Sequence, residues 1–206
     1  MQSDLPMRGS VQTPSVRKSE TVSTRLVIVV DRGIYRFARH WLRWTNLLFW
    51  IYVCAIIAAP LLTASGQSRV ASPLYRFFGL FCHQQGDRSF HIAGHPFACC
   101  ERCAAVYCSM AVAATLFALF RGRIRRIRYA ELVLLCTPLV IDGMAVGAGL
   151  YPGNPLIRVL TGTCFGLALV WAAFPRLDAG FATMGAHLIA MFDRLAAQGR
   201  AKPLSA

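Results

Sequence analysis

The chain has 206 residues, of which 56% are hydrophobic and only 15% are charged, so it is too apolar for an ordinary soluble domain with one core. Its formal net charge of +13 suggests a nucleic-acid partner. However, the cations lie beside apolar runs, as they do at the flanks of membrane helices, and we expect no nucleic-acid partner. The composition therefore predicts an all-α protein whose first partner is the lipid bilayer.

The two ends of the chain are expected to lie outside the bilayer core. Residues 1–24 are rich in Ser, Thr, Gln and Pro and have no hydrophobic period, which predicts a disordered cytoplasmic tail. Residues 25–44 alternate aromatic and basic side chains at helical spacing, which predicts an amphipathic interfacial helix on the inner leaflet. The apolar run in residues 177–206 is too short to cross the membrane and predicts a second interfacial helix followed by a cytoplasmic tail.

Residues 45–176 between these ends predict a four-helix membrane domain. A hydrocarbon core of ~30 Å requires ~20 apolar residues per helix, and the runs that qualify are about 47–64, 103–120, 132–150 and 156–175. With four spans, one side of the membrane carries 17 Lys and Arg residues and the other carries 5. The positive-inside rule then places both termini in the cytoplasm and the loop 65–102 outside the inner membrane, on the periplasmic side in a bacterium.

Small residues predict which spans approach closely. Ala105, Ser109 and Ala113 form a small-residue face on the second span. The Gly-x-x-x-Gly pairs, at 143 and 147 in the third span and at 162 and 166 in the fourth, favour close packing between those two spans.

The outward loop and the helix that follows carry the strongest chemical signal. Four of the eight cysteines and three of the five histidines lie between Cys82 and Cys103. Cys100-x-x-Cys103 can supply two thiolates to tetrahedral zinc from one turn, with Cys82 as a third ligand. The fourth ligand is chosen from a histidine or a further thiol, namely His83, His91, His95 or Cys99. Zinc is the suspected cofactor, and Cys82, His83, Cys100 and Cys103 are the preferred ligands.

The same cysteines allow two other interpretations. The outward side is oxidising, so they could form structural disulfides. Alternatively, Cys100 and Cys103 lie at a helix N-terminus beside Arg102, where a thiol pKa is lowered. Such a centre resembles the quinone-linked disulfide generators with four helices, and Cys82 and Cys99 would then be its exchange partners.

A second signal is Asp142, an acidic residue inside the third span. On insertion scales its charge costs ~2.5–3.5 kcal/mol at mid-membrane, so such a residue is retained for a partner or a task. It is expected either to pair with Arg158, at the start of the fourth span, or to act as an acid or base in a polar pocket. Arginine binds phosphate and carboxylate groups bidentately, so an anionic lipid-linked or small substrate is expected in this pocket. The predicted binding residues are Arg88, Arg102, Asn154, Arg158 and Thr161.

The combined pattern resembles an uncharacterised prokaryotic family of integral membrane proteins with a domain of unknown function. The resemblance covers about residues 74–170 and implies a small multi-spanning protein without an established activity. A glutamine usual shortly after Asp-Gly is missing here, where Met144 to Val146 stand. The residues that carry the resemblance are Cys82, His83, Gln84, Arg88, Ser89, Phe90, Gly94, Cys100, Arg102, Cys103, Tyr107, Asp142, Gly143, Asn154, Arg158, Thr161, Gly162 and Gly166.

A third hypothesis is a transporter or a non-catalytic assembly factor. Four helices form only a thin pathway, so transport would require a homo-oligomer. The sequence therefore does not assign an enzymatic reaction.

Overall fold

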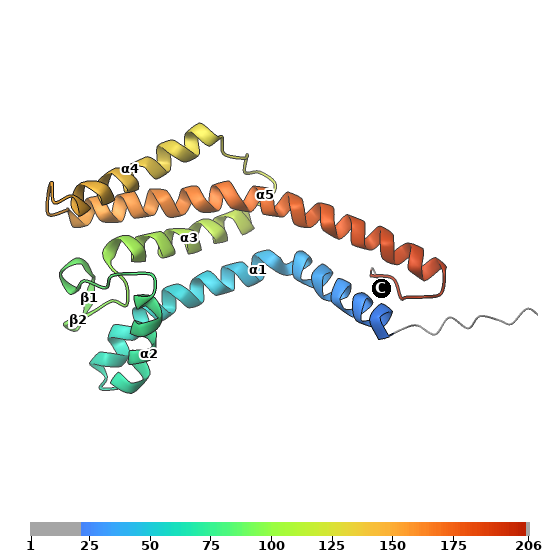
Figure 1. Cartoon of the computed structure of the whole chain (residues 1–206), viewed down its shortest axis with the longest axis horizontal. Helices are drawn as coiled ribbons and strands as arrows, with labels where there is room; N and C mark the ends of the chain where they lie inside the picture. The colour runs from blue at the N-terminus through green and yellow to red at the C-terminus, as the bar shows by residue number, and fades with distance from the viewer. Residues whose placement is uncertain (1–21, 205–206) are drawn as a thin grey trace, which may run out of the picture.

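The computed structural model describes residues 22–204, and this part of the chain is mostly helical (Figure 1). The helices α1, α3, α4 and α5 are long and apolar enough to cross a membrane, which confirms the prediction of four candidate spans. A short helix, a 3-10 turn at Gly86–Arg88 and a two-stranded hairpin lie between α1 and α3. The elements are α1 (Val22–Ala64), α2 (Ser68–Gly79), β1 (His91–Ile92), β2 (His95–Pro96), α3 (Glu101–Leu119), α4 (Tyr129–Gly147) and α5 (Pro155–Ala197).

The first and last helices are longer than a membrane span. Each has 43 residues and so extends for about 65 Å at ~1.5 Å per residue, roughly twice the ~30 Å hydrocarbon core. About half of each helix must therefore lie outside that core. Figure 1 shows the N-terminal part of α1 and the C-terminal part of α5 extending beyond α3.

These two extensions pack against each other through aromatic side chains. Trp41 of α1 meets Phe174 of α5 with ring centroids 5.2 Å apart, and Phe37 meets Phe181 at 5.9 Å. Because α1 and α5 are each one continuous helix, residues 25–44 and 177–197 are parts of these helices and not the separate helices that were expected. Their place on the inner leaflet remains a prediction. Residues 1–21 of the expected tail 1–24 lie outside the described residues. Residues 22–24 belong to the first turn of α1, which begins at Val22.

Helix α3 packs between α1 and α5, and α4 lies along the outer side of α5 (Figure 1). One apolar cluster joins Trp41 and Leu42 of α1 with residues of α3 and α5, namely Ala114, Phe117, Val170 and Phe174. In α4, which the structure describes completely, Asp142 is the only buried residue. The exposed apolar side chains of α4 are those expected of a helix that faces lipid.

Two glycines of α5, Gly162 and Gly166, face α3. A Cβ atom at Gly162 would lie 2.6 Å from the carbonyl oxygen of Arg102, and one at Gly166 would overlap the hydroxyl of Ser109. Helices α4 and α5 do pack side by side, as predicted (Figure 1), but this glycine pair lies against α3 and does not form that contact. Glycine permits the closest approach where the partner helix also has small side chains, and the small-residue face is on α3.

The segment between α2 and α3 is folded onto the end of α1. Phe78, Cys82 and Cys99 are buried in a second apolar cluster that includes Ile56 of α1. The side-chain amide of Gln84 donates hydrogen bonds to two carbonyl oxygens, that of Tyr75 at 2.6 Å and that of Ala98 at 2.7 Å. These bonds hold the two ends of the loop together and bring Cys82 to the start of α3.

Candidate functional site

Three thiols converge where the loop meets α3. The sulfur atoms of Cys82, Cys100 and Cys103 all lie within 4.8 Å of one another. Cys100 is the N-cap of α3 and Cys103 lies in the first turn of that helix, so both face Cys82. Sulfur atoms bound to one zinc at ~2.3 Å lie about 3.8 Å apart in a tetrahedron. The spacing of the three sulfurs is therefore compatible with one shared zinc ion.

Cys82 is the thiol that is best stabilised as a thiolate. Hydrogen bonds from the thiols of Cys100, Cys103 and Cys99 lower its pKa well below the usual range. The backbone amide of Cys100 also donates to the Cys82 sulfur at 3.1 Å. Conversely, the hydrogen bond to Cys82, together with burial, raises the pKa of Cys99. A thiolate is both the metal ligand and the nucleophile of thiol chemistry, so this arrangement favours either role.

The candidate fourth ligands lie outside the group of three sulfurs. Cys99 is fully buried and contacts Cys82, but it does not join the group. His83 lies beside the cluster on the wall of a cavity, and His91 and His95 lie on the hairpin. The structure thus brings together three of the four preferred zinc ligands and leaves His83 next to them.

The cavity beside the thiols has a volume of about 310 Å³, and both the Cys/His cluster and the predicted anion-binding arginines line it. Its walls come from the loop, α3, α4 and α5. The three clustered thiols, His83 and three arginines line it, the arginines being Arg88, Arg102 and Arg158. No carboxylate among residues 22–204 lines it, so the charged groups on its wall are the three guanidinium groups and the Cys82 thiolate.

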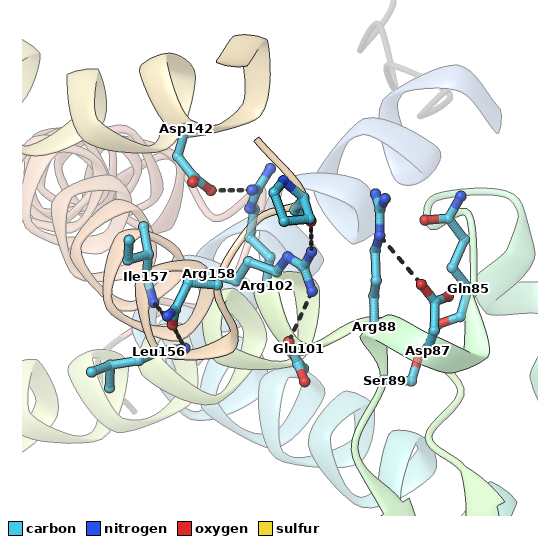
Figure 2. Close-up of polar contacts among 12 residues, drawn as sticks. Gln85, Asp87, Arg88, Ser89, Glu101, Arg102, Asp142, Leu156, Ile157 and Arg158 are labelled. Carbon is cyan, nitrogen blue, oxygen red and sulfur yellow. Dashed lines mark hydrogen bonds and ion pairs between the residues drawn. The ribbon is translucent and has the colours of Figure 1, made fainter. Parts of the chain in front are cut away.

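Two ion pairs hold two of these arginines (Figure 2). Arg102 pairs with Asp142, and Arg158 pairs with Glu101 at 3.4 Å. Asp142 thus pairs with Arg102 and not with the expected Arg158. The reason is the close approach of α5 to α3, which places the first turn of α5 beside the first turn of α3. Sequence reasoning missed Glu101, although an acid directly before Arg102 at a helix start was a usable signal.

The Arg102–Asp142 pair leaves polar atoms without partners. Within the described part of the chain, Nε of Arg102 and Oδ1 of Asp142 are buried and make no hydrogen bond. Among the described residues, Arg88 forms an ion pair only with the neighbouring Asp87, at 3.7 Å, and the side chain of Asp87 is 76% exposed. Exposed pairs of this kind contribute ~0–1 kcal/mol, so Arg88 is available to a ligand.

Two predicted binding residues do not line the cavity. The side-chain oxygen of Asn154 accepts hydrogen bonds from the amides of Leu156 at 2.8 Å and Ile157 at 3.4 Å, so it caps α5. Thr161 is buried and donates its hydroxyl to the carbonyl oxygen of Ile157 at 2.8 Å. It lines a separate groove between α4 and α5.

Comparison with known proteins confirms the resemblance seen in the residues. Residues 82–172 match the family described as "Predicted membrane protein (DUF2085)", and this segment contains every cavity-lining residue except Phe81. The uncharacterized protein MJ1492 of Methanocaldococcus jannaschii is 28% identical to the chain over 136 residues, which are 62% of this chain and 86% of that protein. No solved structure matches the chain.

Proposed function

We propose that residues 82–172, which match the DUF2085 family model, hold zinc at a thiolate site that opens onto a binding cavity for an anionic group. One observation carries the proposal. The three thiols that lie within 4.8 Å of one another and the three arginines line the same cavity of about 310 Å³.

The donor set fits zinc. Thiolates are soft ligands that select zinc over hard cations such as magnesium, and Cys82, Cys100 and Cys103 would supply three of them. His83 or an oxygen atom of the ligand would be the fourth ligand, since His83 lines the same cavity as the three thiols. A zinc ion held there supplies positive charge and Lewis acidity. It would also tie the loop to α3.

The arginines would bind the anionic group. Guanidinium groups recognise phosphate and carboxylate through paired hydrogen bonds. Arg102 and Arg158 are held in place by their acidic partners, and Arg88 is free to approach the ligand. In this proposal Asp142 acts as the anchor of Arg102. An acid–base role for Asp142 has less support, because its carboxylate does not line the cavity.

We place the cavity on the outward side of the inner membrane. The excess of Lys and Arg at the two termini and in the loop 121–130 supports this orientation through the positive-inside rule. The extensions of α1 and α5 lie at the opposite end of the molecule from the start of α3 (Figure 1), which agrees with both extensions being cytoplasmic.

Metal analysis of the detergent-purified full-length protein, together with a free-thiol count, tests the proposal. We expect about one zinc per chain, as three converging thiolates require, and we expect Cys100→Ser to lose it. Cys108→Ser is the matched control, because Cys108 lies on the same helix, is exposed and stands outside the cluster. Protein without bound zinc, or with the same zinc content in both variants, would refute the metal site.

A second candidate is a quinone-linked thiol oxidoreductase. The observation that favours it is the contact of Cys82 with Cys99 as well as with Cys100 and Cys103, which gives two neighbouring thiol pairs. Oxidation of the Cys100–Cys103 dithiol to a disulfide releases two electrons and two protons, which a quinone would accept to form a quinol. The same experiment separates the two candidates, because this one requires protein without zinc and with fewer free thiols.

A further inference from the structure

We propose that the anionic group in the cavity is the head group of a membrane lipid whose chain lies in the groove between α4 and α5. This inference rests on the proposed anion site and names its substrate class. The ligand is an amphiphile that enters from the bilayer, as opposed to a soluble anion that enters from water.

The groove has a volume of about 430 Å³, and its walls are apolar. Leu134, Ile141 and Ala145 of α4 and Ile157 of α5 contribute to its lining. From Leu134 to Ala145 it follows α4 for about 16 Å at ~1.5 Å per residue. That is about half of the ~30 Å hydrocarbon core, the depth of the chains in a single leaflet.

The cavity and the groove share a wall. Arg102 lines the cavity and Asp142 lines the groove, and these two side chains form an ion pair. On α4, Val146 lines the cavity and the adjacent Ala145 lines the groove. In this proposal, a molecule with a charged end and an apolar end occupies both hollows, with the junction of its two ends beside the Arg102–Asp142 pair.

The shared wall also carries an unpartnered acceptor. Asp142 is only 5% exposed, and its Oδ1 atom makes no hydrogen bond within residues 22–204. A buried carboxylate oxygen is costly to leave without a donor. A hydroxyl group at the junction of head group and chain, such as a glycerol or sugar hydroxyl, would satisfy it.

The sizes of the two hollows favour a lipid over a soluble anion. Ligand pockets usually measure ~300–1,000 Å³, so the cavity is near the lower limit and suits a head group alone. A chain held in the groove keeps the attached head group at a high effective concentration beside the arginines, a gain that a soluble anion lacks. The role of the groove is to orient the chain so that the head group meets the arginines.

Three probes test the inference on the detergent-purified full-length protein by native mass spectrometry. Dipalmitoyl phosphatidic acid carries an anionic head group and two chains, and glycerol 3-phosphate is that head group without chains. Dipalmitoyl phosphatidylcholine carries the same chains with a zwitterionic head group. We expect phosphatidic acid to bind at least about tenfold more tightly than either of the others, a difference easily resolved in dissociation constants.

A groove-filling variant localises the chain. Ala145→Phe should lower the preference for phosphatidic acid over glycerol 3-phosphate by about tenfold, with a wild-type zinc content reporting that the fold is intact. Met144→Phe is the matched control, since Met144 is the neighbouring residue, is 69% exposed and does not line the groove. Equal binding of phosphatidic acid and glycerol 3-phosphate by the wild type would overturn the inference and leave the anion site standing. No binding of either would overturn both, and zinc-free protein that still prefers phosphatidic acid would support the inference while refuting the metal site.

Discussion

The ion pair between Arg102 and Asp142 should be one of the most stability-sensitive contacts in the molecule. Asp142 has a side chain that is 5% exposed, and the side chain of Arg102 is 22% exposed. Removing one partner of a buried pair leaves an uncompensated charge and typically costs 3–5 kcal/mol. Because Arg102 keeps some contact with water in the cavity, we expect Asp142→Ala to lower the free energy of unfolding by about 3 kcal/mol, the lower end of that range.

The molecule provides a matched control for this prediction. Arg121 and Asp178 form an ion pair at the far end of α3, with side chains that are 47% and 23% exposed. A pair of that exposure contributes roughly 0–1 kcal/mol, so Asp178→Ala should lower the free energy of unfolding by less than about 1 kcal/mol.

The assay is a double-mutant cycle on the full-length protein, unfolded by SDS in mixed detergent micelles. Asp142→Ala, Arg102→Gln and the double variant should give a coupling energy of about 2–3 kcal/mol, within the range for residues in direct contact. The double variant should be more stable than Asp142→Ala alone, because it removes the stranded charge. The reasoning is refuted if Asp142→Ala and Asp178→Ala destabilise equally, or if the coupling energy is near zero.

Three further predictions concern helix packing, the thiol cluster and a helix cap. Gly162→Ala should lower the free energy of unfolding by about 1–3 kcal/mol by overpacking, because its Cβ would lie 2.6 Å from a backbone oxygen. Gly147→Ala, with no atom within 4 Å of the added Cβ, should be neutral or stabilising; equal losses in the two variants would contradict the close approach. Because the pKa of Cys82 is lowered by its thiol neighbours, its thiolate is present above that pKa and is lost only as the pH falls through it. The wild type should therefore keep its zinc on mild acidification and release it to a chromogenic chelator only at lower pH, whereas Cys82→Ser, like Cys100→Ser, should be purified without zinc; a wild-type zinc content in Cys82→Ser would count against Cys82 as a ligand. Asn154→Ala should cost about 1 kcal/mol of stability and Asn154→Asp much less, since aspartate also caps helices; a loss of zinc in either variant would show that the residue does more than cap α5.

The amino-acid sequence by itself determined the class of the protein and the location of its chemistry. Apolar runs of spanning length follow from the thickness of the bilayer, so the four candidate spans could be read without coordinates. The spacing of Cys100 and Cys103 is local, because one helical turn brings these positions to the same side. Their place at the start of α3 and the family resemblance were likewise readable from neighbouring residues.

Only the tertiary structure decided which distant residues meet. Arg102 pairs with Asp142, and Arg158 pairs with Glu101, because Gly162 brings α5 against α3. Charge and spacing were equally compatible with an Asp142–Arg158 pair. The register between helices depends on side-chain packing, which hydrophobic periodicity does not encode. For the same reason the apolar groove beside Asp142 could not be foreseen, since its walls come from two helices whose separation is set by their contacts with the rest of the molecule.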